Sequence, residues 1–264
     1  MTKILTTVGP VSCNDNVEFC LKKSEILRFN MSHNSLDWHK KNISYVKKKN
    51  PLKYVLVDIP GAKPRTLNNK AIIIKKGQKV TFGYKTNKKN AILISNPLPL
   101  SFKKKTNTFT VSDGVYLFKA ISLSKNLLTG VSLQTFLLQP KKGLNIPYSV
   151  YDDKFQANIY RKFIKKIENF KHDCIGLSFV QSSKIIKNLK KLYPNKIFIS
   201  KIENYMGYLN RKEIISESDA IMIDRGDLAA EVGNDKLTEY SENIINDCKF
   251  FGKPIIIATE NFNS

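Results

Sequence analysis

Short, continuously apolar runs alternate with amphipathic stretches along this chain, and the alternation limits the folds that it can adopt. Seven runs begin near Ile4, Ile26, Val55, Ile175, Ile197, Ala220 and Ile255. Helices are expected over residues 14–24, 36–49, 154–170, 182–193, 209–216 and 237–251. Apolar strands separated by helices favour a parallel sheet with helices outside it. We therefore expect an α/β fold, a TIM-like (β/α) barrel that is incomplete because it has about seven strands.

Residues 67–143 interrupt this alternation. They contain short β-type runs over 71–74, 79–83, 91–95, 108–111, 115–123 and 135–138. Turn signals such as Lys76-Gly77 and Asp113-Gly114 separate the runs. The sequence thus predicts a barrel domain over 1–66 and 144–264, and a small all-β lid domain over 67–143. Two short hinges, 61–66 and 140–147, would let the lid swing over the mouth of the barrel.

The chain is strongly basic, with 44 lysines and arginines against 22 acidic residues and a net charge of +22. Residues 67–143 hold fourteen lysines and a single acid, Asp113. Such a segment attracts polyanions, which include nucleotide phosphates, nucleic acid and anionic lipid. The aromatic residues there are scattered and match no nucleic-acid motif, so we do not expect sequence-specific nucleic-acid binding.

Other features of the sequence predict a cytoplasmic protein. It has no apolar run of about 20 residues, so no membrane span is expected. The N-terminus enters a strand at once, without the basic and then apolar leader of a secretory signal. The four cysteines have no metal-ligand spacing, and free thiols in a reducing compartment are expected: Cys13, Cys20, Cys174 and Cys248.

Charged residues follow two neighbouring apolar runs. The run 196–200 leads into Lys201 and Glu203, whose side chains point the same way because strand residues alternate between faces. The run 220–223 leads into Asp224-Arg225-Gly226-Asp227. Glu203 and Asp227 could hold a divalent cation, with Lys201 beside a developing oxyanion. A salt bridge at a sheet edge is the alternative interpretation of either pair alone.

Several motifs, in this order, resemble those of the pyruvate kinase family, and the resemblance runs from Thr2 to Thr259. They are T-K-I-L-T-T-V-G-P at 2–10, E-I-L-R-F-N-M-S-H at 25–33, V-L-V-D at 55–58, K-G-L-N-I-P at 142–147, I-G-L-S-F-V at 175–180, S-K-I-E-N at 200–204, R-G-D-L at 225–228 and I-I-I-A-T at 255–259. The resemblance implies a barrel with an inserted lid. It also implies a glycolytic phosphotransferase that acts on phosphoenolpyruvate or pyruvate and on ADP or ATP.

The resemblance assigns roles to individual residues. Glu203 and Asp227 would hold Mg²⁺ or Mn²⁺. Arg28 would bind the transferring phosphoryl group, because a guanidinium matches phosphoryl oxygens, although a structural ion pair is the alternative. Lys201 would stabilise charge on the enolate oxygen or the phosphoryl group.

By the same resemblance, Thr259 would lie near the substrate's carboxylate and methylene carbon. Gly226 would let that carboxylate approach backbone N–H groups at the start of a helix. The nucleotide would lie near a further set of residues: Asn30, His33, Arg65 and Lys142.

The monovalent-cation site departs from the family pattern. Potassium-dependent members end their third strand with an aspartate and a threonine, and a glutamate follows four residues later. Asp58 is retained here, Ile59 replaces the threonine, and Lys63 replaces the glutamate. An ammonium could supply the charge of a bound potassium, so we expect K⁺ not to be required. The site or its replacement would comprise Asn30, Ser32, Asp58 and Lys63, unless Lys63 is only one more lysine in a lysine-rich chain.

Two further departures leave the activity open. Asp224 stands where the family has a small residue, and it either points away from the substrate, joins the metal ligands or adds negative charge beside the substrate. The family's eighth strand and C-terminal domain have no counterpart, which indicates a short form with two open sheet edges. We expect a second copy or a partner chain to cover those edges.

Three functions fit these observations. The first is a pyruvate kinase-like phosphotransferase, supported by the motifs and the lid. The second is a metal-dependent enolate enzyme on the same barrel, such as an oxaloacetate decarboxylase or a lyase. The third is a non-catalytic, polyanion-binding remnant of a pyruvate kinase, supported by the lysine-rich insert.

Overall fold

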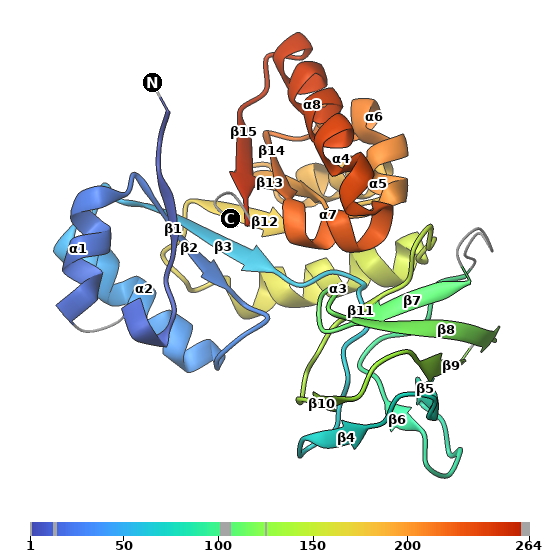
Figure 1. The fold of residues 1–264 in the computed structure, drawn as a ribbon. Coiled ribbons are helices and arrows are strands. Elements are labelled where there is room, and N and C mark those ends of the chain that lie inside the picture. The colour runs from blue at the N-terminus through green and yellow to red at the C-terminus, as the bar shows by residue number, and fades with distance from the viewer. Residues whose placement is uncertain (1, 13–14, 101–106, 125, 260–264) are drawn as a thin grey trace.

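Seven parallel strands form one curled sheet in the computed structural model, which describes residues 2–12, 15–100, 107–124 and 126–259 (Figure 1). Their order across the sheet follows the chain. They are β1 (Leu5–Thr7), β2 (Ile26–Asn30), β3 (Tyr54–Ile59), β12 (Cys174–Leu177), β13 (Ile197–Ile202), β14 (Ala220–Asp224) and β15 (Ile255–Ala258). The expected α/β fold with seven parallel strands is confirmed.

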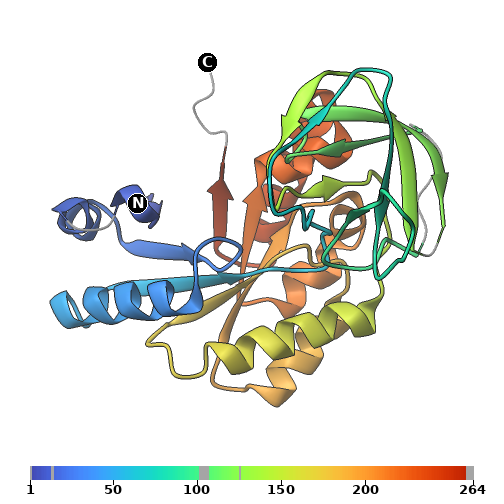
Figure 2. The ribbon, with the colours of Figure 1, turned by 90° about the horizontal axis from the view of Figure 1, so that it is seen from below.

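Helices cover the convex side of this sheet (Figure 2). They are α1 (Asp15–Lys23), α2 (Leu36–Lys49), α3 (Asp153–Lys166), α4 (Ser183–Leu192), α5 (Tyr205–Leu209), α6 (Arg211–Glu217), α7 (Arg225–Val232) and α8 (Asn234–Phe250), with the 3₁₀ turn η1 at Pro10–Ser12. Side-chain caps mark where two of them begin. Ser35 accepts a hydrogen bond from the Trp38 N–H at the start of α2, and Asp152 accepts one from the Phe155 N–H at the start of α3.

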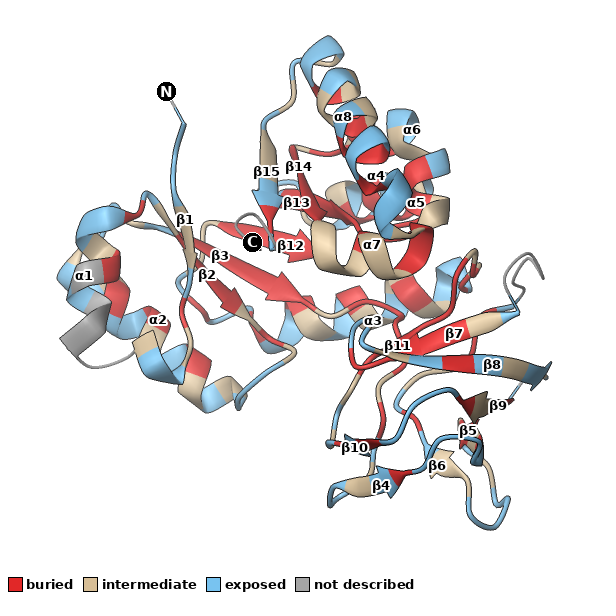
Figure 3. Ribbon diagram, in the orientation of Figure 1, coloured by how far each residue is buried: buried red, intermediate tan, exposed pale blue. Residues whose placement is uncertain are grey.

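Strand side chains that face the helices form the main core, and the central strands are its most buried part (Figure 3). Phe29, Val57 and Phe198 belong to this core, as do Ile43 of α2 and Ile244 of α8. The β-branched and aromatic residues of these runs suit a sheet that is covered on this face.

The concave face of the sheet is only partly filled. A second, smaller cluster lies there, made of Leu56, Cys174, Ile199, Ala220, Met222 and Ala258. Among the residues that the structure describes, the sheet does not close, because β1 and β15 are its two end strands. A cavity of about 820 Å³ on this face is lined by residues of both end strands. A closed barrel of this kind packs its interior with side chains.

The insert forms two antiparallel or mixed sheets of its own. One pairs β4 (Ile72–Ile74) with β10 (Phe136–Leu138). The other runs in the order β11-β7-β8-β9-β5-β6. Its strands are β5 (Lys79–Gly83), β6 (Ile92–Leu93), β7 (Thr108–Val111), β8 (Tyr116–Leu123), β9 (Leu127–Ser132) and β11 (Leu144–Asn145). Phe82, Phe109 and Phe118 pack against one another in its core.

Three of the strands and α-helices were not expected from the sequence: the strands β9 and β11 and the helix α5. Strand β11 lies just after the expected insert 67–143, although it joins the larger sheet of the insert. Strand β9 was not expected, because Gly130 in its middle is a strand-breaking signal. Here the lack of a side chain is required, since a Cβ on Gly130 would lie 2.6 Å from the Phe109 ring. The helix expected over 209–216 corresponds to α6, and the short helix α5 before it was not expected. Between the two helices, the Asn210 amide donates to the Gln181 carbonyl at 2.7 Å.

Three of the cysteines are buried free thiols: Cys20, Cys174 and Cys248. Cys13 lies outside the described residues. Among the helices of the described residues, none combines the length and the apolar character needed to cross a membrane.

Candidate active site

The carboxyl ends of the strands converge on a pocket of about 60 Å³ on the concave face, next to the insert. Parallel strands bring their C-terminal ends to one edge, so residues far apart in the chain meet there. The pocket is lined by Arg28, Asn30, Ser32, Pro60, Gly61, Lys63, Arg65, Ser178, Phe179, Lys201, Glu203, Asp224 and Asp227. Nine of these residues were singled out in the sequence for chemical or charge-based reasons, and most belong to different strands or loops.

Asp58 is the centre of a buried charge network beneath the pocket. Arg28 contacts it through Nε at 2.8 Å and Nη2 at 2.7 Å, and the Lys201 Nζ lies 3.0 Å from the same carboxylate. The Ser178 hydroxyl donates to its other oxygen at 3.0 Å. Burial alone would raise the pKa of Asp58, but the charges of Lys201 and Arg28 lower it. Asp58 is therefore ionised and holds both cations in place.

The Lys201 ammonium is shared among three carboxylates. Besides Asp58, it lies 2.7 Å from Glu203 and 3.5 Å from Asp224. Burial acts to lower the pKa of Lys201, but these acids outweigh it and leave the pKa above its ordinary value. Burial likewise acts to lower the pKa of Arg28, but the charges of Asp58 and Asp224 leave it raised. Both side chains thus remain cationic in a site that is largely closed to water.

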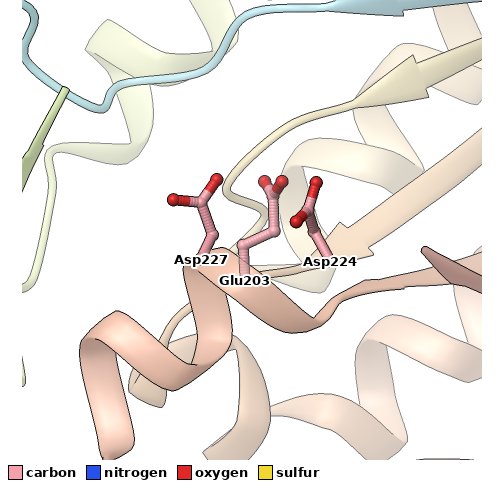
Figure 4. A group of neighbouring side chains, drawn as sticks. All are labelled: Glu203, Asp224 and Asp227. Atoms are coloured by element: carbon pink, nitrogen blue, oxygen red, sulfur yellow. The ribbon is translucent and has the colours of Figure 1, made fainter. Parts of the chain in front are cut away.

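Glu203, Asp224 and Asp227 form an acidic group above this network. Each offers a carboxylate oxygen within 4.8 Å of the others, and Figure 4 shows Glu203 between the two aspartates. Glu203 also accepts a hydrogen bond from the Phe179 N–H at 2.6 Å. The pKa of Glu203 is raised to about 8, because burial and then the nearby carboxylates of Asp227 and Asp224 outweigh the charge of Lys201. A bound cation would relieve this repulsion.

These carboxylates fit a small divalent cation. Mg²⁺ and Mn²⁺ prefer hard oxygen ligands, and Mg²⁺ is usually held by one or two carboxylates while substrate oxygens and water complete its ligands. Glu203 and Asp227, expected from the sequence to be metal ligands, lie close enough to share one ion. Asp224 belongs to the same group, which the sequence left open.

Lys63 contacts Asp227 and links the insert to the barrel. Its Nζ is 2.5 Å from Asp227 of α7 and 2.6 Å from Asp113 of the insert. Asn145 also donates to Asp227, at 3.3 Å. Burial would raise the pKa of Asp227, but Lys63 lowers it. Lys63 therefore pairs with Asp113 and Asp227 and not with Asp58.

The other members of the expected monovalent-cation set lie nearby. Asn30 and Ser32 line the pocket, and the Asn30 side-chain oxygen accepts a hydrogen bond from the Ser32 N–H at 3.0 Å. Asp58 lies below them in the network with Arg28 and Lys201. The structure thus brings the four residues to one region, with Lys63 and Asp58 bound to different partners.

Thr259, Gly226 and Asp224 form a short chain of hydrogen bonds at the end of β15. The Thr259 hydroxyl donates to the Asp224 carboxylate at 2.7 Å and accepts from the Gly226 N–H at 3.1 Å. Gly226 lies in the first turn of α7, whose N-terminus faces this point. The φ of Thr259 is 59°, which lies in the left-handed region.

The residues expected to bind a nucleotide lie on the side of the insert. Burial lowers the pKa of His33, and the charges of Arg65 and Lys142 lower it further. Arg65 donates to the Lys141 carbonyl at 3.3 Å, beside the connection between barrel and insert. His33, Arg65 and Lys142 thus share one region with Asn30 but take no part in the buried network around Asp58.

Sequence reasoning missed three contributors. Ser178 binds Asp58, Asn145 binds Asp227, and Glu231 is a buried acid one turn after Asp227. Asn145 lies within the K-G-L-N-I-P motif and Ser178 within I-G-L-S-F-V, so the motifs held a signal for both. Glu231 had no such signal, because its burial depends on packing.

Comparison with known proteins agrees with the family resemblance of the sequence motifs. The family model for the barrel domain of pyruvate kinase matches residues 1–264. A cytosolic pyruvate kinase isozyme of Glycine max is 30% identical over 100% of this chain and 55% of its own length. A pyruvate kinase of Thermococcus litoralis is 30% identical over 98% of the chain and 58% of its own length, and one of Thermotoga maritima is 29% identical over 100% and 59%. The chain spans little more than half the length of these relatives.

Proposed function

This chain belongs to the pyruvate kinase family, and we propose that it transfers a phosphoryl group between phosphoenolpyruvate and a nucleoside diphosphate. The observation that carries the proposal is the convergence of Lys201, Arg28, Glu203 and Asp227 at one pocket. A cation site, a fixed ammonium and a guanidinium together suit the charge that develops in phosphoryl transfer.

The transfer breaks the bond between phosphorus and the enol oxygen, and forms a bond from phosphorus to a terminal oxygen of the nucleoside diphosphate. Arg28, held by Asp58, would bind the phosphoryl oxygens as they move. Lys201 would stabilise the negative charge left on the enol oxygen. The resulting enolate takes a proton at its methylene carbon to give pyruvate, and Thr259 lies at the strand end where we place that carbon.

Glu203 and Asp227 would hold the divalent cation, Mg²⁺ or Mn²⁺. When bound, this ion supplies Lewis-acid polarisation of the substrate's carboxylate and enol oxygens. The chain's own residues prepare the site, since the Phe179 N–H and Lys201 orient Glu203, while Lys63 and Asn145 orient Asp227. Such support of a metal ligand by neighbouring groups fixes its orientation.

We place the nucleotide phosphates between the barrel and the insert, next to Asn30, His33, Arg65 and Lys142. The insert's lysines make this side of the molecule attractive to anions. The lid is tied to the barrel by the contact of Asp113 with Lys63, which lies at the edge of the pocket. An opening of that contact would admit the nucleotide.

We also propose that the activity needs no K⁺, because the Lys63 ammonium supplies a fixed positive charge next to Asp227. The test is a titration of KCl into an assay that contains only Tris or Na⁺ as the monovalent cation. Constant activity is expected. A large activation by K⁺ means that Lys63 does not replace the ion.

One observation favours a second candidate function. Asp224 stands beside the proposed cation where the family pattern has a small residue, and this departure favours altered chemistry at the same metal site. A metal-dependent enolate enzyme, such as an oxaloacetate decarboxylase or a lyase, needs the cation and Arg28 but no nucleotide. The retained lid and the residues on its side favour phosphoryl transfer over this alternative.

The end strands of the sheet support a proposal about assembly. Ile4 beside β1 is 57% exposed and Ile257 of β15 is 44% exposed, next to the cavity on the concave face. Exposed apolar side chains beside the end strands of a sheet favour association. We propose that a second copy or a partner chain covers them, in the cytoplasm, where the names of several plant relatives place those proteins. Light scattering of the purified chain tests self-association.

The function is tested by pyruvate formation from phosphoenolpyruvate and ADP in the presence of Mg²⁺. Turnover is expected for the wild type, and the Lys201→Met variant should lose it while it still binds the cation. No turnover together with ordinary Mg²⁺ binding supports the enolate enzyme, in which case oxaloacetate is the next substrate to assay. A protein that binds no divalent cation would be a non-catalytic remnant.

A further inference from the structure

We propose that Asp224 is a specificity-determining residue whose own carboxylate competes with the carboxylate of the substrate. The inference rests on the proposed function, because it concerns the same pocket and the same cation. A pocket with Asp224 should differ from one with a small residue at position 224 in its affinity for the cation and for carboxylate ligands.

The first support is the hydrogen bonding of Thr259. A hydroxyl has one hydrogen to donate, and Thr259 donates it to Asp224 at 2.7 Å. The Gly226 N–H at the start of α7 is directed at the Thr259 oxygen at 3.1 Å. A ligand carboxylate that uses these donors must first displace Asp224 from Thr259.

The second support is charge at close range. Asp224 is only 8% exposed, and one of its oxygens lies within 4.8 Å of oxygens of Glu203 and Asp227. Water screens such a charge poorly, so its effect on neighbouring charges is large. Lys201 compensates it only in part, because its nearer partners are Glu203 at 2.7 Å and Asp58 at 3.0 Å, against 3.5 Å for Asp224.

These two features have opposite effects on the two ligands of the site. A third carboxylate strengthens the binding of a divalent cation when no chelating ligand is bound with it. The same carboxylate repels a dianionic chelator that binds next to the cation, and it also occupies the Thr259 hydroxyl. A site with Asp224 should therefore bind its metal more tightly, and dianionic carboxylates more weakly, than a site with a small residue.

The test compares wild type with Asp224→Ala and Asp224→Asn by titration calorimetry, with Mn²⁺ and oxalate as probes. Oxalate is a planar dianion that offers two adjacent oxygens to the cation. For the Mn²⁺-loaded protein, Asp224→Ala should bind oxalate about tenfold or more tightly than wild type, while Mn²⁺ alone binds more weakly. Asp224→Asn removes the charge and keeps an acceptor for Thr259, so it should show a smaller change in the same direction.

Glu213→Ala is the matched control, because it removes an acid of the same charge from the exposed face of α6. It should leave both affinities unchanged. If Asp224→Ala does not fold, as judged by circular dichroism, Asp224→Asn still reports the effect of charge.

Two outcomes overturn the inference, and they are distinguishable. Equal oxalate affinity in the wild type and in the folded Asp224 variants refutes the competition by Asp224 and leaves the proposed function intact. Binding of Mn²⁺ without binding of oxalate in the wild type and every variant refutes the proposed substrate site next to the cation. The inference about Asp224 is then refuted as well.

Discussion

At the scale of single residues, Asp58 holds the site together, because Arg28 and Lys201 both depend on its carboxylate. Removal of one partner from a buried ion pair leaves an uncompensated charge. We expect Asp58→Asn to lower the free energy of unfolding by about 3 to 5 kcal/mol, measured by urea denaturation at neutral pH.

The pH dependence of this effect follows from the lowered pKa of Asp58 in the folded state. The contribution of Asp58 to the free energy of unfolding is complete at pH values above the ordinary carboxyl pKa. It is lost as the pH falls through the pKa of Asp58 in the folded state. The difference between wild type and Asp58→Asn should therefore shrink in acid. Glu18→Gln, which removes an acid from an exposed pair with Lys49, should change stability little at any pH. A small, pH-independent effect of Asp58→Asn would contradict this account.

Glu231 gives a second prediction with the opposite sign. It is 3% exposed, and burial raises its pKa well above the usual value of 4.5 despite the charge of Lys63. The folded state then retains a proton that the unfolded state releases, so stability is lost as the pH rises above the unfolded-state pKa. Relative to wild type, Glu231→Gln should gain stability with rising pH, by at most about 1.4 kcal/mol per pH unit.

Urea denaturation of both proteins at about pH 5, 6.5 and 8 measures this difference. Glu217→Gln, on the partly exposed end of α6, serves as the control, since it should show no such trend. A difference between wild type and Glu231→Gln that stays constant with pH would show that Glu231 is ionised in the folded protein.

Some of the site could be predicted from the sequence at this scale, and some could not. The alternation of side chains along one strand placed Lys201 and Glu203 on the same face, where the structure has them 2.7 Å apart. The partners of Lys63 lie 50 and 164 residues away along the chain, at Asp113 and Asp227. No local pattern reports contacts of that separation, so the pairing of Lys63 required the structure.

At the scale of elements, the connection between barrel and insert is closely packed around Gly143. A Cβ there would lie 2.5 Å from the Lys63 Cε and 2.8 Å from the Asp113 carboxylate. Gly143→Ala should therefore separate Lys63 from Asp113. We expect amide hydrogen exchange in residues 61–66 and 140–147 to accelerate by about tenfold, measured by mass spectrometry.

Gly9→Ala provides the comparison, because an added Cβ at Gly9 meets no atom within 4 Å. The same segments of this variant should exchange at the wild-type rate. Unchanged exchange in Gly143→Ala would mean that the contact of Lys63 with Asp113 does not hold the insert on the barrel.

The elements themselves were largely predictable, and the exceptions have physical causes. All seven parallel strands were expected from continuous apolar runs, which are a strong local signal of strands in a parallel sheet. Strand β9 was missed because Gly130 weakens that signal, whereas the reason for the glycine, the Phe109 ring, lies on another strand. Helix α5 was missed because its 5 residues are too few for a helical period to be recognised.

At the scale of the whole molecule, the net charge of +22 works against the compact state through self-repulsion. A rise in NaCl from about 0.1 to 1 M shortens the screening length from about 10 to 3 Å. We expect the Tm to rise by about 4 °C or more, measured by differential scanning calorimetry. The rise should diminish near pH 10.5, where about half of the lysines have lost their charge. A Tm that is constant or falls with salt would contradict this expectation.

The concave arrangement of the whole sheet underlies the central claim, that Glu203 and Asp227 share one divalent cation within reach of Lys201 and Arg28. Electron paramagnetic resonance of added Mn²⁺ tests it most directly, because bound and free ions give distinct signals. One tight site is expected in the wild type, and it should be lost in Glu203→Gln and in Asp227→Asn but kept in the distant control Asp219→Asn. Wild-type protein that leaves Mn²⁺ free, or undiminished binding in both site variants, would contradict the account.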